Sequence, residues 1–260
     1  RRPVIAWNST TPSAYQSAAA VSADGVRWFL LNASPDVREQ LSRLTTEPPA
    51  GVRHVPVAGV LATDAELDHT LGITLLREAR DLRVYLTRSM QAVLEKDSRV
   101  LPVTRAFARV EVTDLPLGAS IPLHYPDGSV SGLTVEAFPV PGDPPRFARR
   151  NGPGHTVGFT IRQDGGAACV FLPGCGALDD ALLARLAGAE LLLFDGTFWS
   201  DDELVTLGIS DRTARQMGHL PVGGPGGSLE RLGALPVRHR VYTHINNSNP
   251  ILLERSAERA

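Results

Sequence analysis

The amino-acid sequence predicts a layered α/β fold with mixed sheets, and two features of its pattern support that prediction. Short strand-like runs recur along the 260 residues, with helix-like segments interspersed among them, which is typical of layered α/β proteins. Two hairpin turn signals, Ala-Asp-Gly at 23–25 and Asp-Gly-Gly at 164–166, join neighbouring strand-like runs. We expect a single domain over residues 1–260, which is common at this length.

The expected elements follow in chain order from these apolar patterns. The strand-like runs are 18–22, 26–32, 57–62, 82–87, 109–113, 133–140, 156–162, 167–172, 191–194 and 240–243. The helical patterns are 36–44, 70–79, 89–96, 179–186, 201–207 and 228–232. Ser89 and Ser228 are the expected N-caps of two of these helices, and Pro250 fits the first turn of a terminal helix.

The composition limits the classes of function. Hydrophobic residues make up 43% of the chain, which supports a well-buried core. The formal net charge of −2 indicates no broad basic surface for nucleic acid. No apolar stretch approaches the roughly 20 residues of a membrane span, and no signal segment opens the chain. Cys169 and Cys175 lie too far apart along an extended chain for a disulfide. We therefore expect a cytoplasmic protein without membrane partners.

The most informative segment is VLATDAELDHTLG at residues 60–72. Its apolar start reads as a strand end, and Asp64, Glu66, Asp68 and His69 follow before a helical pattern begins. Carboxylates and an imidazole in such a place are what a hard or borderline metal ion binds. Taken alone, the segment fits a solvated acidic turn equally well.

Further candidate ligands lie far downstream, near the ends of other strand-like runs. Asp195 and His244 each follow such a run directly, and His219 lies in a loop. A single histidine in such a place is more often a hydrogen-bonded structural residue. Recurrence at several strand ends instead favours a metal site at one edge of a sheet sandwich.

Six segments of the chain resemble the pyrroloquinoline quinone (PQQ) biosynthesis protein B family of the metallo-β-lactamase superfamily. They are AVSADGVRWFLLNASPDVREQL (20–41), LATDAELDHTLGITLLREA (61–79), LPGCG (172–176), LLFDGTFW (192–199), MGHLPVGGPGGSL (217–229) and HINNSNPILLERSAERA (244–260). The resemblance spans nearly the whole chain. It implies a metallo-β-lactamase-like αββα sandwich with two mixed sheets and the metal at one sheet edge.

The resemblance also sets an expectation for the two ends. Members of the family usually open with a glycine-rich strand and a cysteine cluster that holds a structural zinc, and they continue into a final strand. Residues 1–260 contain neither pattern at the start and stop before the last strand. We expect these three elements to be absent, either because the chain is trimmed or because it is a shortened relative.

The superfamily's first metal motif is His-x-His-x-Asp-His, and its first two histidines are replaced here by Asp64 and Glu66. The retained pair, Asp68 and His69, makes with His244 a set of two histidines and one carboxylate. Such a set is associated with non-haem Fe(II) oxygenases. The resemblance implies Fe(II) held by these three residues, Zn(II) as an alternative ion in the purified protein, and O2 as co-substrate.

The resemblance further implies a hydroxylase that acts on tyrosine in the glutamate–tyrosine unit of a peptide-derived intermediate. His219 and Asp195 would line the cavity as catalytic residues, with His219 as a fourth ligand or a proton-transfer group. Asp64 and Glu66 would orient the ligating imidazoles or bind metal directly.

Asn246, Asn247 and Asn249 directly follow His244 and are candidates for substrate binding, because amides both donate and accept hydrogen bonds. The alternative is that they build a turn and cap the following helix.

Residues 139–154 form a Pro/Gly-rich segment that is either a lid over the site or a plain loop. We interpret the bunched Arg146, Arg149 and Arg150 as a solvated part of this loop rather than as a phosphate site.

Two other function classes stay open at this point. The first is a hydrolase of the wider superfamily that uses a metal-bound hydroxide. The second is a non-catalytic carrier of the quinone or its intermediate. In each case the expected partner is a small peptide-derived molecule, and a homodimer is left open.

Overall fold

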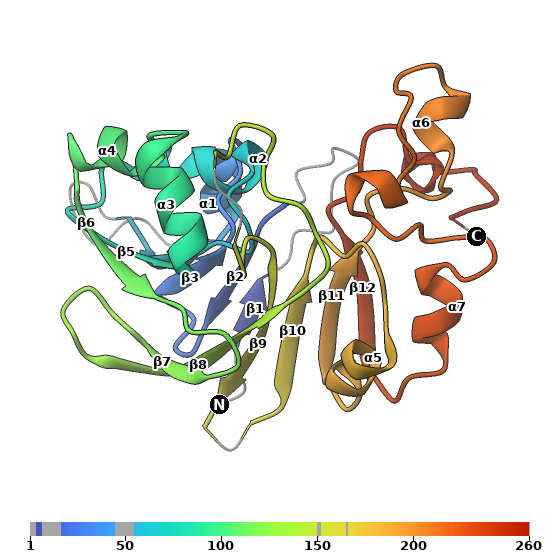
Figure 1. Cartoon of the computed structure of the whole chain (residues 1–260). Coiled ribbons are helices and arrows are strands. Elements are labelled where there is room, and N and C mark those ends of the chain that lie inside the picture. The colour runs from blue at the N-terminus through green and yellow to red at the C-terminus, as the bar shows by residue number, and fades with distance from the viewer. Residues whose placement is uncertain (1–3, 7–16, 45–54, 150–151, 165, 260) are drawn as a thin grey trace.

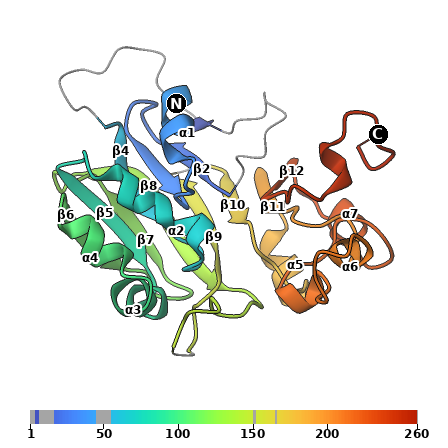
Figure 2. The same cartoon turned by 90° about the horizontal axis from the view of Figure 1, so that it is seen from above.

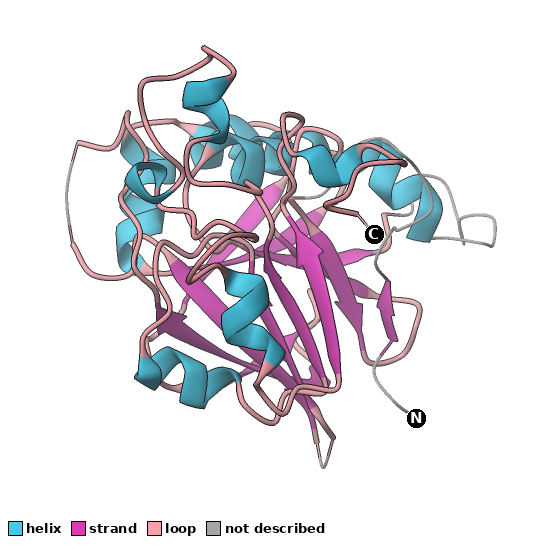
Figure 3. Cartoon of the chain, turned by 90° about the vertical axis from the view of Figure 1, so that its right-hand side faces the viewer, coloured by secondary structure: helices cyan, strands magenta, loops and turns pink. Residues whose placement is uncertain are grey.

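The computed structural model describes residues 4–6, 17–44, 55–149, 152–164 and 166–259. Within these residues, two six-stranded sheets lie in the middle of the molecule, and helices cover their outer faces (Figure 3). Helices α1 to α4 lie beside the first sheet and α5 to α7 beside the second (Figures 1 and 2). The predicted αββα sandwich is therefore confirmed.

The first sheet has the strand order β1-β2-β3-β4-β5-β6. Its strands are β1 (Val4–Ala6), β2 (Ala19–Ser22), β3 (Trp28–Leu31), β4 (Val57–Leu61), β5 (Asp81–Leu86) and β6 (Arg109–Asp114). The predicted hairpin at residues 23–25 makes β2 and β3 antiparallel, and β3 to β6 run parallel. The sheet is therefore mixed, as the sequence predicts.

The second sheet has the order β12-β11-β10-β9-β8-β7. Its strands are β7 (Ser120–His124), β8 (Val130–Pro139), β9 (Val157–Gln163), β10 (Ala168–Leu172), β11 (Leu191–Asp195) and β12 (His239–Thr243). β7 to β10 are antiparallel neighbours, whereas β10, β11 and β12 run parallel. The turn signal at 164–166 lies between β9 and β10, as predicted.

The helices are short. They are α1 (Val37–Leu44), α2 (Leu67–Thr70), α3 (Arg88–Lys96), α4 (Val100–Arg105), α5 (Asp180–Leu186), α6 (Glu203–Thr206) and α7 (Ser228–Gly233), with 3₁₀ turns η1 (Leu71–Leu76), η2 (Arg215–Met217) and η3 (Pro250–Leu252). Pro250 begins η3, as the sequence predicts for a terminal helical turn, and the Asn249 side chain caps that turn.

The neighbouring strands β10 and β11 of the second sheet are buried on both faces, and their alternating side chains enter two different cores. Phe171 of β10 and Leu193 of β11 belong to the larger cluster between the two sheets. Their neighbours Leu172 and Leu192 belong to a smaller cluster that also contains Leu182 of α5. Because successive side chains of a strand point to opposite faces, continuous apolar runs are what a strand covered on both sides requires.

The carboxyl ends of parallel strands from both sheets meet at one edge of the sandwich. β4 ends at Leu61, β11 at Asp195 and β12 at Thr243. The sheets are joined at this edge because the backbone N–H of Val157 donates to the carbonyl of Thr63 at 2.8 Å. The loops that follow β4, β11 and β12 therefore open onto the same space.

Among the described elements, the strands β1 and β7, the helix α4 and the 3₁₀ turn η2 have no counterpart among the predicted ones. Pro122 lies within β7 and Pro102 lies within the first turn of α4, and proline disfavours both structures in the middle of an element. It is accommodated here because β7 is an edge strand and because the first helical turn does not use its N–H groups.

The helix predicted at 70–79 is wrong in its start and in its type. It begins at Leu67 as α2 and continues from Leu71 as the 3₁₀ turn η1. A Cβ added to Gly72 would lie 2.1 Å from the carbonyl oxygen of Ser34, so the backbone of this turn lies directly against a neighbouring segment.

The two predicted serine N-caps are also wrong. Thr87 caps α3 by accepting from the N–H of Met90, and Ser89 donates to the carbonyl of Pro153 instead. Gly227 occupies the N-cap of α7, while Ser228 is paired with the hydroxyl of Tyr242. In both cases tertiary contacts occupy a hydroxyl that local sequence assigns to a helix end.

Candidate metal centre

Asp64 holds His69 in place, and this pairing decides which ring nitrogen faces the pocket. The Nδ1 atom of His69 lies 2.8 and 2.7 Å from the two carboxylate oxygens of Asp64, and both residues are buried. Because an ionised carboxylate only accepts, Nδ1 is the donor. Nε2 of His69 is buried and has no hydrogen-bond partner among the described residues. It lies 3.6 Å from a carboxylate oxygen of Asp68, which is beyond hydrogen-bond reach.

His244 approaches the same carboxylate from the other sheet. It follows β12 directly, and its backbone φ of 58° lies in the left-handed region, which is uncommon for residues other than glycine. This turn places Nε2 of His244 3.2 Å from Oδ2 of Asp68. The rings of His69 and His244 have centroids 4.8 Å apart. One carboxylate and two imidazoles thus converge from α2 and from the end of β12.

Thr197 fixes the tautomer of His244. Its hydroxyl lies 2.6 Å from a carboxylate oxygen of Asp195 and 2.6 Å from Nδ1 of His244. The hydroxyl has one hydrogen, which goes to the carboxylate, so Nδ1 of His244 donates to the hydroxyl oxygen. Nε2 of His244 is then left with a lone pair that faces the carboxylate of Asp68. Two acceptors in this position require a cation between them, either a proton or a metal ion.

His219 is the third imidazole of the site, and a hydrogen bond to Asp195 holds its ring in position. Its Nδ1 lies 2.8 Å from Oδ2 of Asp195, which also accepts the backbone N–H of Cys175 at 2.9 Å. The ring of His219 stacks on that of His244, with centroids 5.4 Å apart. Asp195 is fully buried beneath these rings.

The charges of the site stabilise one another. Burial lowers the pKa of His69, but the carboxylates of Asp64 and Asp68 outweigh it and raise the pKa to about 9. Burial opposes ionisation of Asp64, yet the neighbouring His69 holds the pKa of this carboxyl below its ordinary value. The pKa of Asp195 is lowered in the same way, mainly by His219, whose own pKa is raised in return.

Two overlapping groups of residues have the composition of a metal site. Asp68, His69 and His244 each offer a ligand atom, and these atoms lie within 4.8 Å of one another. The same holds for Asp195, His219 and His244. The first group fits a metal ion better, since it contains the buried and unpartnered Nε2 of His69.

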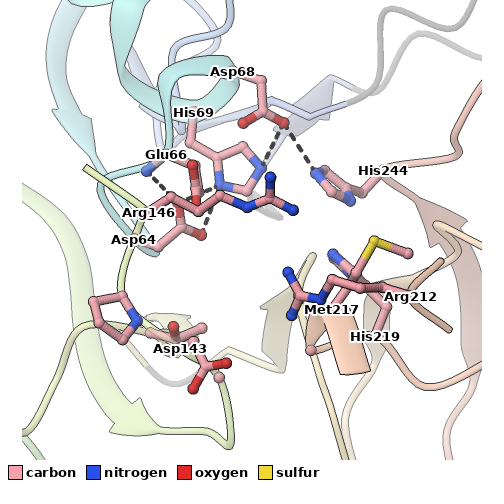
Figure 4. Close-up of a pocket in the computed structure, with 15 residues that line it drawn as sticks. Asp64, Glu66, Asp68, His69, Asp143, Arg146, Arg212, Met217, His219 and His244 are labelled. Carbon is pink, nitrogen blue, oxygen red and sulfur yellow. Dashed lines mark hydrogen bonds and ion pairs between the residues drawn. The ribbon is translucent and has the colours of Figure 1, made fainter. Parts of the chain in front are cut away.

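A pocket of about 380 Å³ opens in front of these side chains. Figure 4 shows Asp68, His69 and His244 on one side of it and Arg212, Met217 and His219 on the other. The segment between β8 and β9 contributes Asp143 and Arg146. Part of the loop predicted at 139–154 therefore borders the site, and both the lid and the plain-loop interpretation stay predictions.

Comparison with known proteins identifies the family. A profile of the β-lactamase superfamily domain matches residues 27–245. Coenzyme PQQ synthesis protein B of Gluconacetobacter diazotrophicus is 40% identical over 269 aligned residues, which cover 99% of this chain and 86% of that protein. The chain belongs to the coenzyme PQQ synthesis protein B family. The member of this family from Methylobacterium nodulans is likewise 40% identical, covering 94% of this chain and 81% of its own length.

A solved structure of the same family has the same fold. The crystal structure of Zn(2+)-bound PqqB from Methylobacterium extorquens has a TM-score of 0.81 and 37% identity, covering 94% of this chain and 81% of that one. A diphosphatase of the PhnP family has a TM-score of 0.60 at 19% identity. The second likeness shows only that the superfamily fold extends beyond the coenzyme PQQ synthesis protein B family.

The structure brings most of the predicted site residues together. Asp64, Glu66, Asp68, His69, His219 and His244 line the pocket, and Asp195 lies directly behind His219. Asp64 accepts a hydrogen bond from His69, which is the contact expected of a carboxylate that orients an imidazole. Cys175 is a buried residue of the tight turn whose thiol donates to the carbonyl of Ala177, and burial raises its pKa to about 12.

The three asparagines occupy different environments. Asn249 is buried, donates to the carbonyl of Gly196 at 2.8 Å and accepts from the N–H of Ile251. Its amide is therefore occupied by the turn, which favours the turn-building alternative for this residue. Asn246 donates to Ser248, and Asn247 is exposed. For Asn246 and Asn247 the substrate contact stays a prediction.

Thr197 and Arg212 are the site residues that sequence reasoning missed. Thr197 lies two positions after Asp195, in the segment LLFDGTFW that carries the family resemblance, so its neighbourhood was a usable signal. Arg212 lies in the segment between α6 and η2, where no motif singles it out.

Proposed function

We propose that this chain is an iron- and oxygen-dependent hydroxylase that acts on the tyrosine of a glutamate–tyrosine unit during synthesis of coenzyme PQQ. The observation that carries the proposal is the set of Asp68, His69 and His244, with a buried ligand nitrogen that has no partner in the described part of the chain. Two imidazoles and one carboxylate with open positions are the donor set of non-haem Fe(II) oxygenases. The name of the relatives places them in PQQ synthesis.

The surroundings of this set support one metal ion rather than two. In the superfamily pattern, positions 64 and 66 carry histidine ligands, whereas here Asp64 is bound to His69. Its carboxylate therefore orients a ligand and is not free to be one. Burial raises the pKa of Glu66, and the charges of Asp64 and Asp68 add to this effect. The neutral thiol of Cys175, turned to a backbone carbonyl, is no bridging ligand.

In the proposed reaction one oxygen atom of O2 is inserted into a C–H bond of the phenol ring, so that a C–O bond replaces the C–H bond and a hydrogen ends on the new hydroxyl group. The other oxygen atom leaves as water, with two protons and two electrons taken from a small-molecule reductant. Bound iron would supply the activation of O2. The protein's own residues hold the parts in position: Asp64 orients His69, and Thr197 orients His244.

His219 is the residue suited to proton transfer. Its Nδ1 is bound to Asp195, which leaves Nε2 as the only ring nitrogen able to exchange a proton with a bound phenol. Asp195 stabilises the protonated ring, because its ionised carboxylate lies 2.8 Å away and is buried.

The test is metal content and stoichiometry after anaerobic reconstitution with Fe(II) or Zn(II), in the wild type and in His244→Ala. We expect one tightly held iron ion per chain that the variant loses, and O2 consumption by the wild type with a Glu–Tyr dipeptide and a reductant. His239→Ala is the matched control, because His239 lies at the other end of β12 and is exposed. Retention of iron by His244→Ala would contradict the assignment of the ligands.

A second candidate function is a metal-dependent hydrolase, which the second group of Asp195, His219 and His244 favours. It predicts two Zn(II) ions per chain and no preference for iron. If no metal is bound specifically, a carrier of the quinone or its intermediate becomes the better account. His69→Ala separates this carrier from both enzymes, since a carrier retains its ligand affinity without this residue.

A further inference from the structure

Two arginines face the pocket from elements that lie apart in the sequence. Arg146 belongs to the segment between β8 and β9, and Arg212 to the segment between α6 and η2. In Figure 4 both guanidinium groups point toward the middle of the pocket, in front of His69 and His219. Arg146 is exposed, as the sequence-based interpretation of a solvated loop predicts, and it lines the pocket as well.

Neither guanidinium forms an ion pair with any residue that the structure describes. Arg212 donates to the backbone carbonyl of Gln216, which anchors the side chain and leaves its other N–H groups available. Arg212 is half-buried, so these donors are partly removed from water. Arginine is the side chain best suited to planar, bidentate binding of a carboxylate.

The acidic residues of the pocket form no ion pair with either guanidinium, although the charge of Arg146 is near enough to lower the pKa of Glu66. Asp64 is bound to His69, and Asp68 lies between His69 and His244. Asp143 also lines the pocket, but its carboxylate points away from both guanidinium groups in Figure 4. Arg212 is then the cation with the fewest charged neighbours in the pocket, and its remaining N–H groups, together with the guanidinium of Arg146, are donors that a carboxylate of a ligand can accept from.

We propose that Arg146 and Arg212 form a carboxylate-binding subsite that selects a tyrosine-bearing di-acid and positions its phenol ring at the metal set. This proposal rests on the proposed function, since a Glu–Tyr dipeptide carries two carboxylates, one at the glutamate side chain and one at its C-terminus. The pocket volume of about 380 Å³ lies within the range of small-molecule sites. The two arginines are specificity-determining residues and take no part in the redox chemistry.

The test is equilibrium binding by calorimetry to Zn(II)-loaded protein, in which no turnover occurs. Three ligands are compared: the Glu–Tyr dipeptide, the Gln–Tyr dipeptide and Glu–tyrosinamide. We expect Arg146→Ala and Arg212→Ala each to weaken Glu–Tyr binding about tenfold or more, in the range of a charge-assisted hydrogen bond. Each arginine holds one of the two carboxylates in this proposal. For the ligand that lacks that carboxylate, the variant should therefore bind within about twofold of the wild-type protein.

The chain offers a matched control for each variant. Arg149 lies three residues after Arg146 and Arg215 three residues after Arg212, and neither lines the pocket. We expect Arg149→Ala and Arg215→Ala to bind Glu–Tyr within about twofold of the wild type. Arg146→Lys should restore part of the affinity, since it keeps the charge but not the planar fork.

Equal losses for all three ligands, or no binding of Glu–Tyr by the wild-type protein, would overturn the subsite. The outcome for the reaction is separate. Carboxylate-dependent binding without O2 consumption by the iron-loaded protein would support the subsite and contradict the hydroxylase. O2 consumption with arginine-independent binding would support the hydroxylase and contradict the subsite.

Discussion

The two halves of the site differ in how far the protein satisfies its own polar atoms. Asp195 accepts hydrogen bonds from Thr197 and His219, and it is fully buried in that network. On the other side, Nε2 of His69 has no partner among the described residues, and Asp68 is 54% exposed. In the first half the carboxylate of Asp195 is paired with Thr197 and His219. In the second half Nε2 of His69 is available to bind a metal ion.

This difference shows how one histidine serves two networks. His244 uses Nδ1 to bind Thr197 in the satisfied half and presents Nε2 to Asp68 in the other. A metal-ligating side chain that hydrogen bonds already hold in position loses little conformational entropy when an ion binds. We therefore interpret the half with Asp195 as the support and the half with His69 as the binding face, and four predictions test that division.

The largest effect is expected from removing a ligand on the binding face. His69→Ala should lower Fe(II) affinity by more than about 100-fold, since it removes a whole ligand where loss of a supporting partner alone costs 10–100-fold. His219→Ala should change it far less, because His219 is not one of the three proposed ligands Asp68, His69 and His244. Competition with a coloured chelator measures both constants. Equal losses in the two variants would remove the distinction between the halves.

The next effect concerns the support and appears in stability. Asp195→Asn should lower the free energy of unfolding of the metal-free protein by about 2–4 kcal/mol, because it leaves buried donors of Thr197 and His219 poorly paired. Urea denaturation measures the loss. Asp68→Asn serves as the matched control on the exposed side, and we expect it to change stability by less than about 1 kcal/mol.

A smaller effect is expected where a carboxylate only orients a ligand. Asp64→Asn should weaken metal binding by about 10–100-fold, the usual range for loss of a partner behind a ligating histidine. It should also lower the pKa of His69, whose raised value depends on this carboxylate. Titration of the metal-free protein followed by NMR measures the second effect. An unchanged pKa would show that Asp68 alone controls the charge of His69.

Local sequence patterns predicted much of the fold, whereas they predicted less of how the site residues come together. The hairpin signals and apolar runs predicted mixed sheets, because local patterns determine strand boundaries, whereas the arrangement in two sheets came from the family resemblance. The ligands Asp68 and His244 were recognisable as polar residues at strand ends. Their separation of 176 positions carries no signal of contact, so their convergence depended on the family resemblance.

What the sequence did not predict depends on contacts between distant segments. The 3₁₀ turn η1 follows from the close approach of Gly72 to the carbonyl of Ser34, which no local pattern encodes. Thr197 acquires its role from histidines 22 and 47 positions away. Arg212 faces the pocket only because its loop folds over it.

The smallest expected effect, counted per pH unit, is a pH dependence of stability that comes from His69 on the binding face. The pKa of His69 is raised from 6.5 to about 9 in the folded chain. Between these values the folded state binds one more proton than the unfolded state, so stability is fully present below about pH 6.5. It falls as the pH rises toward 9, by at most about 1.4 kcal/mol per pH unit.

Metal binding should cancel this fall, because an ion replaces the proton on Nε2 of His69 and is held more firmly as the pH rises. Urea unfolding at pH 6.5, 7.5 and 8.5, with and without Zn(II), measures the two slopes. His69→Gln removes the titrating group and should flatten the metal-free slope, whereas His239→Gln, an exposed site at the far end of β12, should leave it unchanged. If the free energy of unfolding of metal-free His69→Gln still falls with pH, another group is responsible for the pH dependence. The charge of the binding face would then not depend on Nε2 of His69.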